Sequence, residues 1–136
     1  MRKIYSKVDP GVLLHVVVRK GDITNKRMDL SQPEEFLQVG CKKIEFGDVF
    51  PAHFHIDQPR QIGATQESWV IIDGRVRVNY YDIDNTWLGD LELNSGDCWV
   101  TFRGGHAMEV LDDAILYEFK NGPYNGKAKD KEMIDV

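Results

Sequence analysis

Short apolar runs separated by turn residues recur along most of this chain, and they constrain its fold more than any other feature. In the second half of the chain the runs cover residues 68–72, 75–81, 87–93, 98–102, 106–111 and 115–119. The breaks between them are rich in glycine, aspartate and asparagine, which supply positive φ angles or local side-chain hydrogen bonds. None of the runs has the long helical periodicity of an amphipathic helix. The pattern predicts an all-β sandwich or barrel.

The first half of the chain adds two strand-like runs. Residues 12–18 are short, apolar and β-branched, so we expect a buried strand there, and residues 36–46 form a second run. Between them, residues 25–35 are polar and predict at most one turn of helix. Asp73 and Gly74 stand between two apolar runs, which is the strongest hairpin signal in the chain.

The length of the chain indicates a single domain. A chain of 136 residues can bury a real core but is too short for two ordinary domains. We expect one domain over residues 1–136, with its core within about residues 12–120. Residues 121–136 are turn-rich and charged, and they predict a surface tail or docking arm.

Charge and hydropathy exclude several classes of partner. The net charge of -5 and the pI near 5.3 argue against a nucleic-acid surface, which needs clustered lysine and arginine. No apolar run is long enough to span a membrane, and none follows the basic residues at the N-terminus as in a signal peptide. We therefore expect a cytoplasmic protein without a membrane partner. Cys41 and Cys98 form no CxxC motif, and both are expected to be reduced.

Two of the four histidines, His53 and His55, are separated by a single residue. In an extended segment their side chains would share one face while Phe54 points to the other. Neutral imidazole is a good ligand for zinc, iron, nickel or copper. A His-x-His pair also occurs where strand histidines simply pack in a core. His15 is a rival ligand, but it is isolated in an apolar run and is expected to be a core or edge histidine.

The histidine pair belongs to a longer pattern that runs from Gly47 to Gly74. Five residues separate Gly47 from His53, and six separate Glu67 from Gly74. These spacings resemble the first motif of the cupin superfamily, G-x5-H-x-H-x3,4-E-x6-G. Eleven residues lie between His55 and Glu67, where the motif has three or four, so the motif is split by an insertion.

A second stretch resembles the other cupin motif, G-x5-P-x-G-x2-H-x3-N, in degraded form. Gly96 and Gly104 fit the motif, but Phe102 replaces its proline, His106 arrives one residue early, and Val110 stands in place of its asparagine. The resemblance covers about residues 41–119. It implies a cupin-type β-barrel, also called a double-stranded jelly roll.

The resemblance also implies a metal site. It assigns His53, His55 and His106 as imidazole ligands and Glu67 as the carboxylate ligand. They would hold one divalent transition metal ion, Fe, Mn, Ni or Zn, and would leave open positions for a substrate. The resemblance does not name the metal. No organic cofactor is expected.

Four further residues are candidates for the same site. Gln61 or Gln66 would be the fourth ligand if Glu67 is not. Arg60 lies on the insertion and could hold a substrate carboxylate or phosphate, although such loop arginines are often simply solvated. Tyr117 is a candidate acid or hydrogen-bond donor if its side chain points inward, and then the adjacent Glu118 cannot.

Several functions are compatible with a cupin. The first hypothesis is a metal-dependent enzyme that acts on a small polar metabolite, with a carbohydrate or carbohydrate-derived acid favoured by analogy to small cupins. The second is a non-catalytic protein that senses or carries such a ligand. The third is a metal-independent sugar-nucleotide epimerase or isomerase with a histidine base and a tyrosine acid. We expect a homodimer formed by sheet extension at the strand around residues 13–18.

Overall fold

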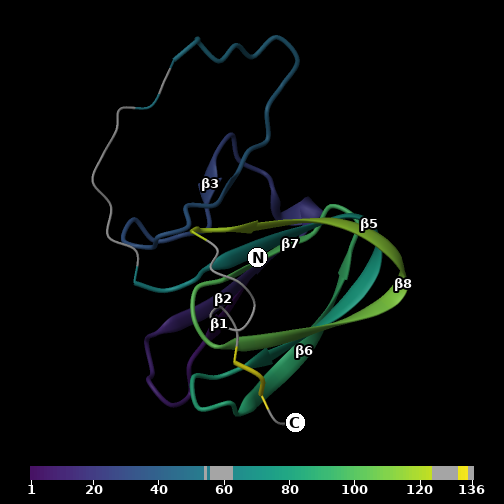
Figure 1. Cartoon of the computed structure of the whole chain (residues 1–136). Helices are drawn as coiled ribbons and strands as arrows, with labels where there is room; N and C mark the ends of the chain where they lie inside the picture. The colour runs from purple at the N-terminus through teal and green to yellow at the C-terminus, as the bar shows by residue number, and fades with distance from the viewer. Residues whose placement is uncertain (54, 56–62, 124–131, 135–136) are drawn as a thin grey trace.

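The computed structural model describes residues 1–53, 55, 63–123 and 132–134, and these residues form an all-β protein (Figure 1). Its strands are antiparallel and belong to one six-stranded sheet and one two-stranded sheet. The six-stranded sheet does not close into a barrel within the described residues, because β1 and β6 are its ends. The described elements are strands and a single 3-10 turn, which confirms the prediction of an all-β fold.

The six-stranded sheet follows the order β1-β2-β7-β5-β6, and β8 pairs with β5 along its other edge. Its strands are β1 (Arg2–Tyr5), β2 (Leu13–Val18), β5 (Glu67–Tyr81), β6 (Trp87–Asn94), β7 (Cys98–Thr101) and β8 (Gly105–Lys120). The two-stranded sheet consists of β3 (Met28–Asp29) and β4 (Gly40–Cys41). The strands predicted at residues 12–18, 87–93 and 98–102 are confirmed to within one residue at each end.

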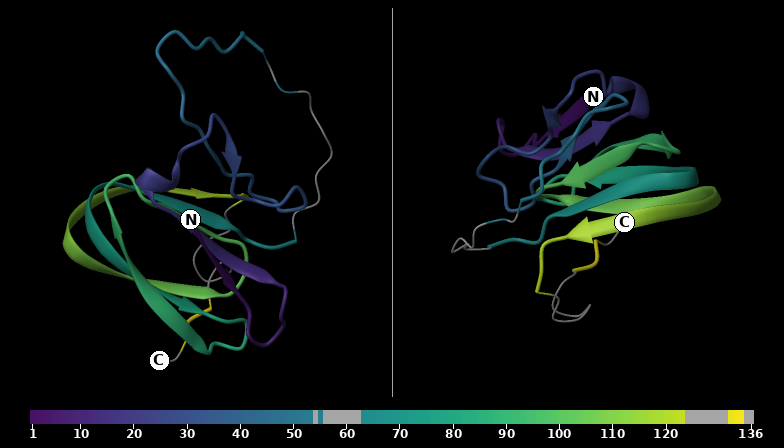
Figure 2. Two further views of the ribbon diagram at one scale, coloured as in Figure 1. Left: turned by 180° about the vertical axis from the view of Figure 1, so that it is seen from behind. Right: turned by 90° about the horizontal axis from the view of Figure 1, so that it is seen from above.

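Strands β5 and β8 dominate the fold because each is long and curved (Figure 2). Two strands and a hairpin were expected across Asp73 and Gly74, but β5 runs through both residues without reversing. Gly74 has a φ of +82°, and with the register shifts around it this produces a bend in place of a turn. The expected break between residues 111 and 115 is likewise absent from β8.

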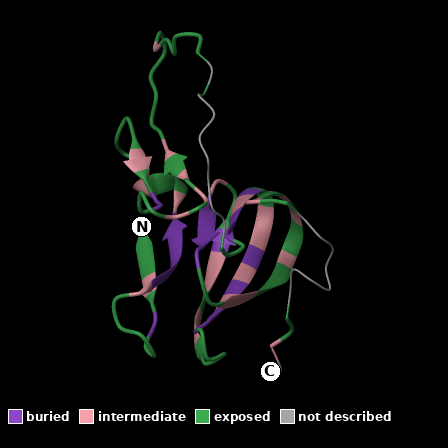
Figure 3. Ribbon diagram, turned by 60° about the vertical axis from the view of Figure 1, so that its left-hand side comes forward, coloured by how far each residue is buried: buried purple, intermediate pink, exposed green. Residues whose placement is uncertain are grey.

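This bend folds the six-stranded sheet back on itself, so that it encloses an inner face between two halves. The first half contains β1, β2, β7, the start of β5 and the end of β8, and the second contains the end of β5, β6 and the start of β8. The inner core draws on both halves: Val17, Ile71, Val76, Val78, Tyr80, Leu93 and Trp99. The buried bands of the curled sheet are visible in Figure 3.

A second core lies on the opposite face of the first half. Its buried members are Leu13, Val16, Val18, Leu30, Cys98, Val100 and Phe102. Ile23, Leu37 and Val39, from the segment that contains β3 and β4, cover this face. The strand predicted over residues 36–46 is wrong beyond β4, because only Leu37, Val39 and Cys41 pack on this face and residues 42–46 are exposed irregular chain.

One other expectation needs correction. Strand β2 lies between β1 and β7, so residues 13–18 are central and do not form a free edge for a partner. Every residue of β2 is buried. Residues 25–35 contain no helix, which is within the expected limit of one turn, and the single helical turn in the described part of the chain is the 3-10 helix η1 (Lys20–Asp22).

The described residues contain no helix whose length and apolar character would allow it to cross a membrane. Both cysteines are free, as expected. Burial raises the pKa of the Cys98 thiol to about 11, so this thiol stays protonated at neutral pH.

Candidate functional site

A row of polar side chains crosses the inner face of four neighbouring strands. His15 on β2 pairs with Thr101 on β7, Thr101 pairs with Glu67 on β5, and Glu67 pairs with Lys120 on β8. Directly paired residues in a sheet present their side chains to the same face. The register therefore places this polar row at one end of the otherwise apolar interior.

His106 reaches the row from the opposite half of the sheet. It stands near the start of β8, in register with Tyr80 at the end of β5. Its Nε2 atom lies 3.2 Å from Oε2 of Glu67, whose side chain is only 7% exposed. Nζ of Lys120 lies 4.0 Å from Oε1 of the same carboxylate. The fold thus brings the Glu67 carboxylate, on β5, together with the His106 imidazole from the start of β8 and the Lys120 ammonium group from its end.

An aromatic wall lies beside this carboxylate–imidazole pair. Trp69 and Trp99 stack with their ring centroids 5.3 Å apart and their planes 8° from parallel. His106 packs edge-on to both rings, at centroid distances of 6.5 Å and 5.7 Å. The Nε1 atom of Trp99 also donates a hydrogen bond to Oγ1 of Thr101, at a distance of 3.0 Å. The wall therefore contacts two members of the site, His106 through ring packing and Thr101 through a hydrogen bond.

His15 is a buried neutral member of the row. Its Nδ1 atom lies 3.1 Å from Oγ1 of Thr101, and its ring packs against Tyr80 at 4.9 Å. Burial lowers the pKa of His15 to about 4, and the nearby His106 acts in the same direction. The imidazole is therefore uncharged at neutral pH. This placement agrees with the expectation of a core histidine.

Four buried polar atoms in or around the row have no hydrogen-bond partner among the described residues. They are Nε2 of His15, Nε1 of Trp69, the hydroxyl of Tyr80 and Nδ1 of His106. A buried polar atom without a partner is costly, and such atoms are rare in folded proteins. Their concentration in one interior is what a site for a polar ligand or ion requires.

The structure does not bring the four predicted metal ligands together. Glu67 and His106 meet, but His53 and His55 are exposed on irregular chain that loops out beyond the sheets (Figure 1). Their rings contact each other edge to face at 5.3 Å, and Nδ1 of His53 lies 2.9 Å from the Pro51 carbonyl oxygen. Among the residues that the structure describes, no group of three or more His, Cys, Asp or Glu side chains is placed to hold a metal.

Gln66 does not fit its predicted role as the alternative fourth ligand. Its Oε1 atom accepts a hydrogen bond from the Leu37 amide, and its Nε2 atom donates to Glu35. Since neighbouring strand residues face opposite sides, Gln66 ties the covering segment to the sheet and points away from the inner face. Arg60 and Gln61 lie outside the described residues.

Tyr117 faces outward, so its predicted role as an acid at this site is not supported by its position. It pairs with Val70 on the face opposite Trp69, and 62% of its surface is exposed. Its ring contacts Phe119 at 6.1 Å, at the surface of the protein.

Sequence reasoning missed Lys120 and Thr101. No motif contains either residue, and only strand register places both beside Glu67. The alternation of inward and outward residues along residues 115–119 could have indicated Lys120, had that strand been extended by one residue. Comparisons of the chain with family models, with curated proteins and with solved structures give no match.

Proposed function

We propose that the chain is a metal-binding protein with a cupin-type jelly roll, and that it acts as an enzyme on a small polar metabolite. One observation carries this proposal. Glu67 and His106 are 39 positions apart in the sequence, and each was expected from its own motif to be a metal ligand. In the fold, Nε2 of His106 lies 3.2 Å from Oε2 of Glu67.

The proposed ligands are His53, His55, Glu67 and His106. A carboxylate oxygen and an imidazole nitrogen that face each other can both turn to one divalent ion. His53 and His55 are exposed in the structure, so the proposal requires both to move from that position to the first half of β8, next to His106. That half of β8 pairs with β5 on one edge, and within the described residues no strand pairs with its other edge.

A bound ion at this position would supply a Lewis acid that polarises substrate oxygens. The other residues of the row have separate tasks. Trp69, the half-buried member of the stacked Trp69–Trp99 pair, offers a flat apolar surface for a sugar ring or similar group. Lys120 supplies a positive charge beside Glu67, which favours an acidic substrate over a neutral one. This arrangement supports a carbohydrate-derived acid as the ligand class.

Metal analysis of the purified protein tests this proposal. We expect about one equivalent of Fe, Mn, Ni or Zn in the wild type and at least a tenfold lower content in Glu67→Gln and in His106→Ala. Glu34→Gln is the matched control, because it removes an exposed carboxylate that lies outside the six-stranded sheet. Circular dichroism checks that each variant is folded. Equal metal content in all four proteins would show that the ligands are assigned wrongly.

A second candidate function is proton transfer without a metal, as in a sugar-nucleotide epimerase or isomerase. The direct Glu67–His106 contact favours it, because a carboxylate orients an imidazole as a general base. Turnover that resists chelators and is lost in His106→Ala would support this alternative. A ligand panel that shows binding to the metal-loaded protein without conversion would instead indicate a sensor or carrier.

A further inference from the structure

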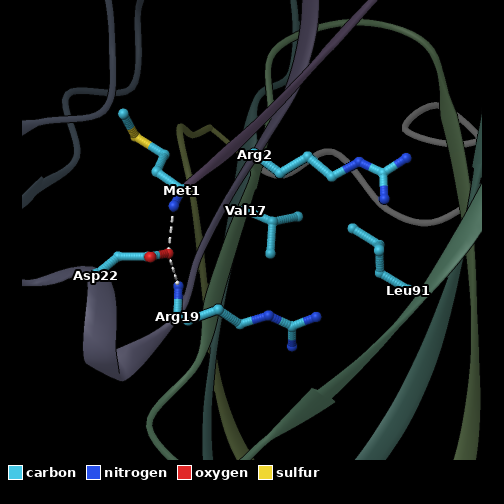
Figure 4. Close-up of a pocket in the computed structure, with 6 residues that line it drawn as sticks. All are labelled: Met1, Arg2, Val17, Arg19, Asp22 and Leu91. Carbon is cyan, nitrogen blue, oxygen red and sulfur yellow. Dashed lines mark hydrogen bonds and ion pairs between the residues drawn. The ribbon is translucent and has the colours of Figure 1, made fainter.

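A cavity of about 260 Å³ lies between β1, β2 and β6. It is lined by Met1, Arg2, Val17, Arg19, Asp22 and Leu91 (Figure 4). The side chains of Arg2 and Arg19 extend in the same direction, with Val17 between them and Leu91 opposite (Figure 4). None of its lining residues belongs to the Glu67–His106 site.

Strand register explains why two arginines share this cavity. Arg2 on β1 pairs directly with Val17 on β2, and Arg19 follows Val17 by two residues. All three side chains therefore point to the inner face of the sheet. Lys3 alternates with Arg2 and pairs with Val16, which belongs to the core on the other face. Only one of the two cations at the start of β1 therefore faces the cavity.

The charges around the cavity leave one guanidinium uncompensated. Arg19 Nη1 pairs with Asp97 at 2.6 Å and donates to the Glu92 carbonyl at 2.5 Å. Asp22 is engaged by the Met1 ammonium group and by the Arg19 amide. Arg2 has no ion-pair or hydrogen-bond partner for its guanidinium in the part of the chain that the structure describes. The polar side of the cavity is therefore positive.

We propose that this cavity binds a phosphate group, with the Arg2 guanidinium as its main contact and the free nitrogens of Arg19 as the second. Planar guanidinium groups match phosphate oxygens in pairs, and such charge-assisted hydrogen bonds are strong. Val17 and Leu91 form an apolar wall suited to the carbon part of a phosphate monoester. The ligand is therefore either free phosphate or a small organic phosphate, and binding is independent of the proposed metal site.

Isothermal titration calorimetry at constant ionic strength tests the proposal, with inorganic phosphate and phenyl phosphate as the two probes. We expect the wild type to bind at least one probe. Tighter binding of phenyl phosphate would assign an organic ester, and equal affinity would assign the phosphate group alone. Arg2→Ala should weaken binding at least tenfold, whereas Lys3→Ala, which removes the same charge from the same strand, should change it less than twofold.

One further variant separates this site from the first. His106→Ala should leave phosphate binding unchanged even if it abolishes metal binding. The proposal is wrong if the wild type binds neither probe at millimolar concentration, or if Arg2→Ala and Lys3→Ala behave alike.

Discussion

Single residues in the interior carry the pH dependence that we expect of this protein. His15 is fully buried and neutral, with a pKa of about 4 in the folded state against 6.5 for an exposed histidine. The unfolded chain therefore binds a proton more readily than the folded chain between these values. The stabilising effect of neutral His15 is complete above pH 6.5 and declines as the pH falls toward 4.

The first prediction concerns this histidine. Between about pH 7.5 and about pH 5, the lowered pKa should cost the wild type about 2 kcal/mol of unfolding free energy. His15→Asn should be less stable at neutral pH but should lack this pH-dependent loss, since it has no imidazole to protonate. His53→Asn, at an exposed position, is the control and should keep the wild-type dependence. Urea unfolding at both pH values measures the effect, and an unchanged pH dependence in His15→Asn would refute it.

Asp82 is the other residue whose chemistry can be tested alone. Burial favours its neutral form, but hydrogen bonds from Ser6, from the Lys7 amide and from the Ile83 amide outweigh this and hold the pKa of the carboxyl below its usual value. The carboxylate fastens the loop after β1 to the turn after β5. Its stabilising effect is present above the ordinary carboxyl pKa and declines at lower pH.

The second prediction is that Asp82→Asn lowers the free energy of unfolding by about 2 kcal/mol at neutral pH, because it replaces a charged acceptor of several hydrogen bonds. Asp84→Asn provides the control in the same turn. Asp84 is exposed and accepts one hydrogen bond, from the Thr86 amide, so we expect a change of less than about 0.5 kcal/mol. Thermal or urea unfolding distinguishes the two, and equal effects would show that the Asp82 contacts do not stabilise the fold.

Among the elements, the bend in β5 determines how the inner face forms. A Cβ atom placed on Gly74 would lie 2.1 Å from the Asp113 carbonyl oxygen and 2.7 Å from Cα of Ala114, both on the backbone of β8. These backbone atoms cannot move away without breaking the β5–β8 pairing. Only glycine fits the close approach of the two strands, and its φ of +82° is also unfavourable for other residues.

The third prediction follows from this contact. Gly74→Ala should lower the free energy of unfolding by more than about 2 kcal/mol, combining backbone strain with the clash against β8. Gly21→Ala is the matched control, since nothing lies within 4 Å of a Cβ atom there and its φ is not positive. Circular dichroism during thermal unfolding gives the comparison. A Gly74→Ala protein as stable as Gly21→Ala would contradict the proposed role of the bend.

The same bend shows where prediction from sequence reached its limit. The apolar runs on both sides of Gly74 were located correctly, but Asp-Gly marks a change of backbone direction and does not say whether the chain reverses. Here β8 pairs with both halves of β5, and this long-range pairing keeps β5 continuous. Strand β1 was missed because Arg2, Lys3 and Tyr5 give it little apolar pattern, and it depends on its pairing with β2.

In the whole molecule, the sequence located part of the candidate site. Glu67 and His106 were named from motif spacing, and the fold brings them together. Lys120 and Thr101 join them only through strand register, which a motif does not contain. The roles of His53 and His55 rest on spacing alone, because the structure places both at the surface.

The most direct test of the central claim is a crystal structure of the metal-loaded protein with anomalous diffraction measured at the absorption edge of the metal. We expect a single strong peak between Glu67 and His106, about 2.0–2.3 Å from a carboxylate oxygen and an imidazole nitrogen. His53 and His55 should complete its coordination. A peak at another position, or no peak while the Glu67–His106 contact of 3.2 Å persists, would contradict the proposed metal site.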